Sequence, residues 1–364
     1  MTVLDVGDNR TIVLAHLPAR LGSTVTNVQE LRHNKGNEAT YGIWRVTGTS
    51  GSAVLKIFRP PTGDWAAYWP TSDEPTHWNY WRRESLAYTR GLVFAYADAG
   101  VVPPAMLACV NRSDGMVELW LEYVDGVDGF SWTPERVGRL AYELGGGQAR
   151  WAGRVEPTSW LSRRWLAQYM TEGPSRGITI QPEDWDDPAV AAWPVVVRHE
   201  LRRLWQERHR ALAATEAAER TLCHLDVWPA NSIDEDGRSV QLDWAFAGEG
   251  AVGEDIGSLV LHCFTDGLMS VDLLPEVTAK CIDGYLQGLA DGGWKGSADG
   301  VRIAIAASGI AKYSWFGPNF ISRVTQGSVI ASDYRSDGSG TAAVESAAPL
   351  VALIAEWSKR VLGK

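Results

Sequence analysis

The sequence has few cysteines for its 364 residues and no Cys-x-x-Cys pair. Cys109, Cys223, Cys263 and Cys281 are far apart, and most have apolar neighbours. This spacing argues against a disulfide framework and against a zinc site, so we expect reduced cysteines in the core.

Long apolar runs and an excess of positive charge are also missing. No segment offers about 18 uninterrupted apolar residues, and no basic stretch followed by an apolar run marks a secretory signal. We therefore expect a cytoplasmic protein that does not bind a membrane. The formal net charge of −10 argues against a nucleic-acid partner, which needs a basic surface. It is compatible with a cationic substrate, although many soluble enzymes are equally acidic.

Strand-like patterns occupy the first third of the chain. Three apolar or alternating runs joined by short turns with glycine predict an antiparallel meander. A loop rich in proline, threonine and aspartate follows, then one helix and a further strand. The expected strands are 28–31, 41–46, 53–58 and 117–124, with the loop at 61–76 and the helix at 78–96.

Helical periodicity dominates the rest of the sequence. The expected helices are 134–150, 160–169, 195–214, 255–264, 271–289, 301–315 and 347–361, and residues 324–345 read as a loop. The sequence thus predicts an α+β fold of two lobes. A small β-rich lobe with one helix spans residues 1–124, and a larger, mostly helical lobe spans 125–364.

The most informative motif is His-x-Asp-x-x-x-x-Asn, followed by a second aspartate between apolar residues. A phosphoryl-transfer site needs a carboxylate that accepts the proton of the attacking hydroxyl, and Asp226 is the candidate. Asn231 and Asp243 supply oxygen atoms of the kind that Mg²⁺ prefers, and His224 is expected to support the loop. Each residue alone reads as an ordinary loop side chain, but the whole motif arises by chance only about once in a hundred such chains.

Lys56 is the second candidate. It lies inside an apolar strand, where a lysine is costly unless it is paired, and it is the only lysine between positions 35 and 280. Its ammonium group suits the phosphates of a nucleotide. Glu84 on the following helix is the expected partner, with Glu38 and Glu118 as competitors. The alternative interpretation is that Lys56 lies at the edge of the sheet and extends its ammonium group into solvent.

Other catalytic motifs are absent or incomplete. The sequence has no Gly-x-Ser-x-Gly elbow and no Gly-x-x-x-x-Gly-Lys-Ser/Thr loop. His199-Glu200 is followed by Arg203 where a zinc-binding histidine is needed. The glycines of residues 36–42 are only a weak phosphate-loop signal, and those of 145–147 fall in a helical stretch.

The chain resembles the aminoglycoside phosphotransferase and choline kinase family, a branch of the protein-kinase-like fold. The matching residues are Lys56, Glu84, His224-Leu225-Asp226, Asn231 and Asp243-Trp244. The resemblance covers about residues 26–320 and is specific at 222–257. It implies ATP or GTP with Mg²⁺ as cofactors and a small-molecule hydroxyl as acceptor. It also implies that Asp255 braces the catalytic loop, and that backbone groups of Glu122 and Val124 bind the nucleotide base. Many members have glycine where this chain has Leu225, and the chain lacks the Asp-Phe-Gly and Ala-Pro-Glu segments of protein kinases.

The sequence leaves two candidate classes of acceptor. An aminoglycoside- or nucleoside-type antibiotic is the first choice, and a sugar, amino alcohol or choline-like metabolite is the second. A non-catalytic nucleotide-binding regulatory protein is the alternative from another class. Eighteen tryptophans, concentrated at 61–80 and 151–195, match no family segment, and one or two of them are expected in a substrate site.

Overall fold

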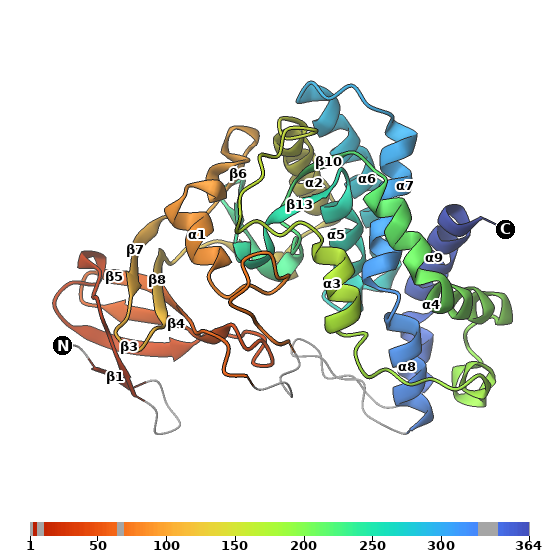
Figure 1. The fold of residues 1–364 in the computed structure, drawn as a ribbon, viewed down its shortest axis with the longest axis horizontal. Helices are drawn as coiled ribbons and strands as arrows, with labels where there is room; N and C mark the ends of the chain where they lie inside the picture. The colour runs from red at the N-terminus through yellow and green to blue at the C-terminus, as the bar shows by residue number, and fades with distance from the viewer. Residues whose placement is uncertain (1–2, 6–10, 64–68, 327–340, 364) are drawn as a thin grey trace.

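The computed structural model describes residues 3–5, 11–63, 69–326 and 341–363. Trp65 and most of the expected loop 324–345 lie outside the described residues. A β-rich N-terminal part lies at one end of the molecule, and a mostly helical part forms the other end (Figure 1). The predicted two-lobed α+β architecture is confirmed, whereas the boundary at residue 124 stays a prediction.

The N-terminal part is built on an antiparallel sheet of five strands in the order β3-β4-β5-β8-β7. The expected meander is confirmed as its first three strands. The edge strand β7 was not predicted, because its half-buried residues do not alternate. The strands are β3 (Val25–Glu30), β4 (Thr40–Gly48), β5 (Gly51–Phe58), β7 (Met106–Asn111) and β8 (Val117–Glu122), and a separate hairpin joins β1 (Val3–Asp5) to β2 (Thr11–Val13).

The alternation of strand β5 places its lysine. Successive side chains of a strand point to opposite faces of the sheet. Leu55 and Ile57 enter a small core with Trp44 on one face. Val54 and Lys56 therefore point to the other face, where both line a cavity.

The helix expected at 78–96 is much shorter than predicted. Only α1 (Arg83–Thr89) is helical, and two short 3-10 turns follow it. The Arg83 guanidinium binds the carbonyl oxygens of Trp78 and of two residues just before it, which holds that segment out of the helix. After α1 the chain turns at Gly91, whose φ of 75° leaves the right-handed helical region.

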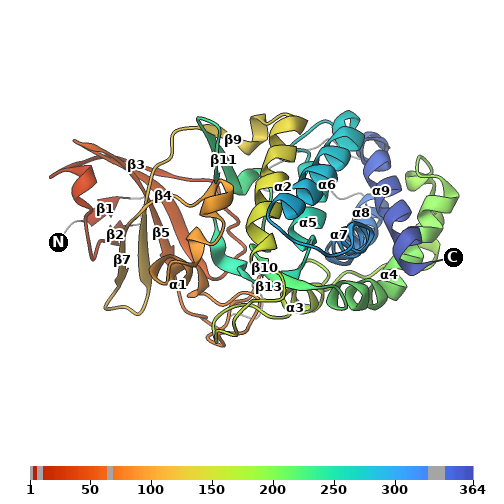
Figure 2. The ribbon, with the colours of Figure 1, turned by 90° about the horizontal axis from the view of Figure 1, so that it is seen from above.

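The C-terminal part packs helices around a large apolar core, with α2 and α6 side by side (Figure 2). The glycines of 145–147 lie within α2, where a Cβ on Gly145 would come within 2.3 Å of the Tyr285 carbonyl oxygen on α6. They therefore serve helix packing. The helices are α2 (Pro134–Ala149), α3 (Trp165–Glu172), α4 (Val195–Glu216), α5 (Glu254–Thr265), α6 (Leu274–Asp291), α7 (Ala298–Lys312), α8 (Phe316–Thr325) and α9 (Thr341–Leu362).

Two of these helices differ from the sequence prediction. The helix expected from residue 160 begins at Trp165, because the carbonyl of Ser162 accepts a bond from the backbone N–H of Glu249 and the segment runs extended. Helix α8 was missed, because a turn before Phe316 ends the periodicity of α7.

Short strands frame the predicted catalytic motif. The loop of residues 224–231 joins β10 (Arg220–Cys223) to β11 (Ser232–Glu235). A small sheet has the order β6-β12-β11-β9, and β10 pairs with β13. The remaining strands are β6 (Val101–Val102), β9 (Val127–Asp128), β12 (Arg238–Gln241) and β13 (Gly248–Ala251).

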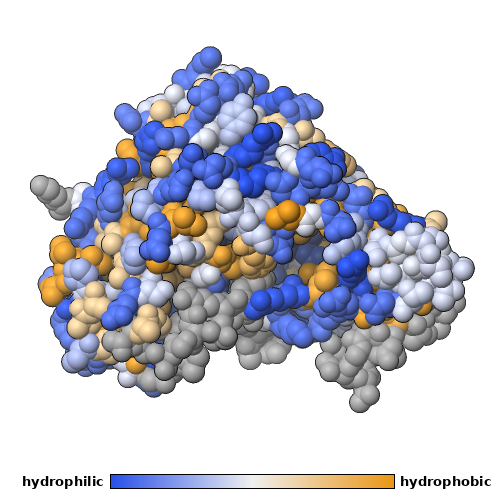
Figure 3. Space-filling view, turned by 180° about the vertical axis from the view of Figure 1, so that it is seen from behind, coloured by the Kyte–Doolittle hydropathy of each residue, from blue (hydrophilic) through white to orange (hydrophobic). Residues whose placement is uncertain are grey.

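The face of the molecule drawn in Figure 3 is mostly hydrophilic, and apolar side chains form smaller groups on it. Among the helices that the structure describes, none has the length and apolar character needed to span a bilayer.

Candidate active site

The loop that carries the motif is held by one buried carboxylate. Asp255, at the start of α5, accepts hydrogen bonds from the backbone N–H groups of His224 (2.9 Å) and Leu225 (2.7 Å). The Gln148 side chain donates a third bond at 2.7 Å. Burial raises the pKa of Asp255 to about 6, although these N–H donors pull it down. The bracing contact implied by the family resemblance is thus present.

His224 connects this loop to the one that carries the second aspartate. Its Nδ1 accepts from the Asp226 backbone N–H at 3.2 Å, so Nε2 carries the proton and donates to the Leu242 carbonyl at 2.9 Å. Burial lowers the pKa of His224 to about 4, which favours this neutral tautomer. The His224 side chain therefore supports the loop, as the sequence predicts. Its partner Leu242 directly precedes Asp243 in the chain.

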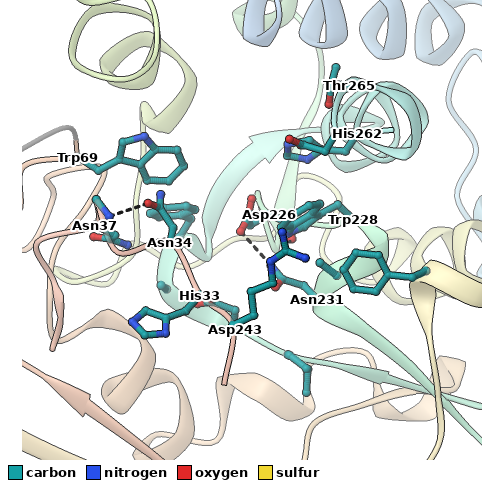
Figure 4. A pocket seen from close by; sticks show the side chains of 18 of the residues that line it. His33, Asn34, Asn37, Trp69, Asp226, Trp228, Asn231, Asp243, His262 and Thr265 are labelled. Atoms are coloured by element: carbon teal, nitrogen blue, oxygen red, sulfur yellow. Dashed lines mark hydrogen bonds between the residues drawn. The ribbon is translucent and has the colours of Figure 1, made fainter. Parts of the chain in front are cut away.

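Asp226 and Asn231 contact each other directly. The Asn231 amide donates to Asp226 Oδ2 at 2.9 Å and to its carbonyl at 3.1 Å. Because the amide nitrogen makes both of these bonds, the Asn231 amide oxygen stays available as an acceptor. Figure 4 shows Asp226 beside Asn231, with His262 and Trp228 next to it. Burial raises the pKa of Asp226 to about 7, and Lys312 opposes this rise.

Lys56 joins the sheet to the Asp243 loop. Its ammonium group forms an ion pair with Glu84 on α1 and a second one with Asp243 Oδ1 at 3.0 Å. Burial pushes the pKa of Asp243 upward, but Lys56, helped by His224 and Glu84, holds it below the ordinary value. Burial raises the pKa of Glu84 to about 7 in spite of Lys56. Burial alone would lower the pKa of Lys56, but Asp243 and Glu84 raise it above the ordinary lysine value.

The competitors for Lys56 are engaged elsewhere. Glu38 accepts bonds from Thr62 and from the Thr71 backbone N–H. Glu118 pairs with Arg112 at 2.7 Å. The choice of Glu84 therefore agrees with the contacts.

Glu122 ends strand β8 and Val124 lies two residues after it. Both line the cavity, and the Glu122 N–H donates to the Ala105 carbonyl at 2.9 Å. No described contact tests their predicted binding of a nucleotide base, which stays a prediction.

Seven of the nine predicted site residues line one cavity of about 860 Å³, and His224 and Asp255 lie behind its wall. The seven are Lys56, Glu84, Glu122, Val124, Asp226, Asn231 and Asp243. One side, called here the nucleotide end, is lined by apolar residues of the sheet and the 121–124 segment together with Lys56. The other side, called here the acceptor end, lies between Asp226 and the helices of the C-terminal part. It is lined by Trp165, Tyr169, Trp228, His262, Lys312, Trp315, Phe316 and Phe320.

More tryptophans line the cavity than expected. Trp69, Trp165, Trp228 and Trp315 take part, where one or two were predicted. Trp69 belongs to the first tryptophan-rich segment and Trp165 to the second. Both pack against Phe246, which lies three residues after Asp243. The two segments thus meet at the site although they are far apart in the sequence.

Sequence reasoning missed Lys312, at the end of α7. Its Nζ lies 3.8 Å from Asp226 Oδ1 and donates to Ser258 Oγ at 2.7 Å. The signal was available, because Lys312 is one of only seven lysines and follows an apolar run, as Lys56 does. Its burial is nearly complete, with 4% of the residue exposed.

Arg83 was missed as well. The buried guanidinium donates to five carbonyl oxygens, including those of Trp160 (2.9 Å) and Ala245 (3.1 Å). Arg83 therefore joins α1 to the second tryptophan-rich segment and to the loop after Asp243. Burial lowers its pKa to about 9.

Comparison with known proteins gives one family. A model of the "phosphotransferase enzyme family" matches residues 31–296, well over half of the chain. No curated protein gives a match.

Similar solved structures have low sequence identity. An amicoumacin kinase, hAmiN, in complex with AMP-PNP, Ca²⁺ and Ami is 13% identical, with a TM-score of 0.49, 91% of this chain covered and 87% of that one. An aminoglycoside phosphotransferase from Alicyclobacillus acidocaldarius is 17% identical, with a TM-score of 0.49 and coverages of 92% and 95%. The choline kinase LicA from Streptococcus pneumoniae is 16% identical, with a TM-score of 0.48 and coverages of 91% and 94%.

Proposed function

The chain belongs to the phosphotransferase enzyme family, and we propose that it is a Mg²⁺-dependent kinase that transfers the γ-phosphate of ATP or GTP to a hydroxyl group of a small molecule. One observation carries the proposal. The Lys56 ion pairs with Glu84 and Asp243 and the Asp226–Asn231 contact open on the same cavity. Phosphoryl transfer needs this combination of a phosphate-binding cation, metal-binding oxygens and a carboxylate base.

Asp226 is the proposed base. Asn231 holds one carboxylate oxygen and fixes the side chain from the nucleotide side. Burial brings the pKa of Asp226 to about 7, close to a neutral working pH, where a general base is most effective. A hydroxyl bound at the acceptor end would donate its hydrogen bond to this carboxylate and turn its oxygen toward the phosphate.

The metal-binding proposal concerns Asn231 and Asp243. The Asn231 amide oxygen is left as an acceptor, and Lys56 keeps Asp243 ionised. Both are oxygen ligands suited to Mg²⁺, which when bound neutralises charge on the phosphate oxygens. Within the described ranges no three His, Cys, Asp or Glu side chains come together. A metal here would therefore complete its coordination with phosphate and water oxygens.

The nucleotide end suits a base and its phosphates. Ile43, Val54 and Leu121 offer apolar surface beside the predicted backbone contacts of Glu122 and Val124. Lys56 remains protonated over the whole physiological range, since its carboxylate partners raise its pKa. It is proposed to bind the α- and β-phosphates while Glu84 fixes its position.

The acceptor is proposed as an aminoglycoside- or nucleoside-type antibiotic, with a sugar, amino alcohol or choline-like metabolite as the second candidate. The names of the similar structures cover both groups, since they include amicoumacin and aminoglycoside kinases as well as a choline kinase. A non-catalytic regulatory protein would be expected to have lost part of the set Lys56, Asp226, Asn231 and Asp243, and this chain keeps all four.

The test is nucleotide consumption with ATP and with GTP, with and without Mg²⁺, against a panel of antibiotics, sugars and amino alcohols. Asp226→Asn should abolish turnover and still bind nucleotide, whereas Asp243→Ala should lose Mg²⁺-dependent nucleotide binding. Asp236→Asn, at an exposed turn residue, is the matched control and should behave as wild type. Full activity in Asp226→Asn would remove Asp226 as the base. Silence of the wild type across the panel would favour the regulatory alternative.

A further inference from the structure

The acceptor end already contains a cation of its own. Lys312 Nζ lies 4.9 Å from the centre of the Trp165 ring, with Ser258 as hydrogen-bond partner and the Asp226 carboxylate 3.8 Å away. Aromatic faces attract cations, and this one is used by the protein's own ammonium group. A second ammonium group, brought by a substrate, would meet a positive charge beside the base.

Among the described residues of the acceptor end, carboxylates and cations are equal in number. Besides Asp226 and Lys312, the described charged residues that line it are Asp266 and Arg323. Each carboxylate is thus matched by one cation. His262 adds no charge, since burial, reinforced by Lys312, keeps its pKa well below the ordinary value. A polycationic acceptor needs an excess of carboxylates, which the described residues of this end do not offer.

We propose that the acceptor is a non-basic hydroxyl compound of the glycoside or nucleoside type, and that Lys312 sets the selection against ammonium-bearing acceptors. The proposal rests on the phosphotransferase function and narrows the candidate acceptors to those without ammonium groups. Ring or ether oxygens accept from Lys312, while the aromatic walls cover the apolar faces of the molecule. The reacting hydroxyl lies at Asp226.

The test uses pairs of hydroxyl compounds that differ chiefly in charge. Suitable pairs are choline with 3,3-dimethyl-1-butanol, glucosamine with N-acetylglucosamine, and kanamycin with N-acetylated kanamycin. The ratio of kcat/KM within each pair is measured for wild type, Lys312→Met, Lys312→Arg and Lys295→Met. Lys295 is an exposed loop residue away from the cavity and serves as the matched control.

Wild type should favour the neutral member of each accepted pair by about tenfold or more, a difference of roughly 1.4 kcal/mol. Lys312→Met should reduce that preference by about tenfold, whereas Lys312→Arg and Lys295→Met should keep it. Preference of the wild type for the ammonium-bearing member, or an unchanged ratio in a folded Lys312→Met protein, overturns the proposal and leaves the phosphotransferase function intact.

Binding gives a readout that does not need turnover. Quenching of tryptophan fluorescence is followed for both members of each pair in the presence of AMP-PNP and Mg²⁺, since several tryptophans line the cavity. Tighter binding of the neutral members supports the proposal even if no phosphate is transferred, and in that case the proposed kinase function fails alone. Absence of binding by every neutral member overturns the proposal.

Discussion

Leu225 is in a backbone conformation that leucine rarely adopts. Its φ is 66°, in the left-handed region, and it lies directly before the proposed base. The Leu225 N–H is tied to Asp255, and the side chain is 2% exposed in the core. The strain is held in place by this bond and by packing. A glycine at this position would be free of this strain.

The strain at Leu225 can be detected by comparing the unfolding free energies of its alanine and glycine variants. Left-handed backbone costs roughly 1–2 kcal/mol for a residue with a Cβ. Glycine inside a helix is about 1 kcal/mol less stable than alanine. Leu225→Gly should therefore be about 1 kcal/mol more stable than Leu225→Ala, whereas at the buried helical Leu259 the order should be reversed. All four variants lose stability relative to wild type, by about 2–5 kcal/mol for the alanine forms, because a buried leucine is truncated.

The assay is urea unfolding of the four variants, followed by tryptophan fluorescence and compared as free energies of unfolding. The difference between the two positions should be about 2 kcal/mol, twice the usual effect of the backbone alone. If Leu225→Gly is less stable than Leu225→Ala by the same amount as at Leu259, the strain does not exist. Loss of turnover in Leu225→Gly without further loss of stability would show that the strained backbone positions Asp226.

Three further predictions concern buried charges. Lys56→Met leaves Glu84 and Asp243 without their cation, so we expect a loss of about 3–5 kcal/mol of unfolding free energy, and Glu84→Gln added to it should restore part of that loss. Arg83→Lys replaces five donors by three, so at least two carbonyls lose their partner and urea unfolding should show a loss of several kcal/mol, at about 1–3 kcal/mol for each. Burial raises the pKa of Glu254 to about 7 from an ordinary 4.5, so its ionisation opposes folding. The stability of wild type relative to Glu254→Gln should therefore fall as pH rises from 4.5 to 7, by on the order of 3 kcal/mol, and a constant difference between the two proteins across that window would contradict this.

Local patterns in the sequence determine much of the fold. The meander follows from alternation and turn residues, and most C-terminal helices follow from their 3.6-residue period. The pairing of Lys56 could be inferred from its chemistry, because a lysine in an apolar strand requires a carboxylate. Buried Glu84 and half-buried Asp243 both pair with it.

Tertiary contacts account for what the sequence did not predict. The residues before α1 have helical composition, but the Arg83 side chain takes their carbonyl oxygens, and no local pattern announces that choice. The start of α3 was misplaced because Ser162 pairs with a strand that begins more than eighty residues later. Trp69 and Trp165 meet only in the folded chain, so the number of tryptophans in the cavity could not be counted from spacing.

Asp226 and Asp243, two of the aspartates that line the cavity, illustrate how neighbouring charges give different protonation behaviour to the same kind of side chain. Lys56 contacts Asp243 directly and helps to keep its pKa below the ordinary value, so this carboxylate stays charged, as its proposed role of metal ligand requires. Asp226 is buried with a more distant cation, Lys312, and its pKa rises to about 7, where it can take up and release a proton. Pairs of carboxyl groups whose surroundings push their pKa values apart mark division into acid–base and electrostatic roles. In this chain the difference depends on two lysines from apolar elements, one on each side of the cavity.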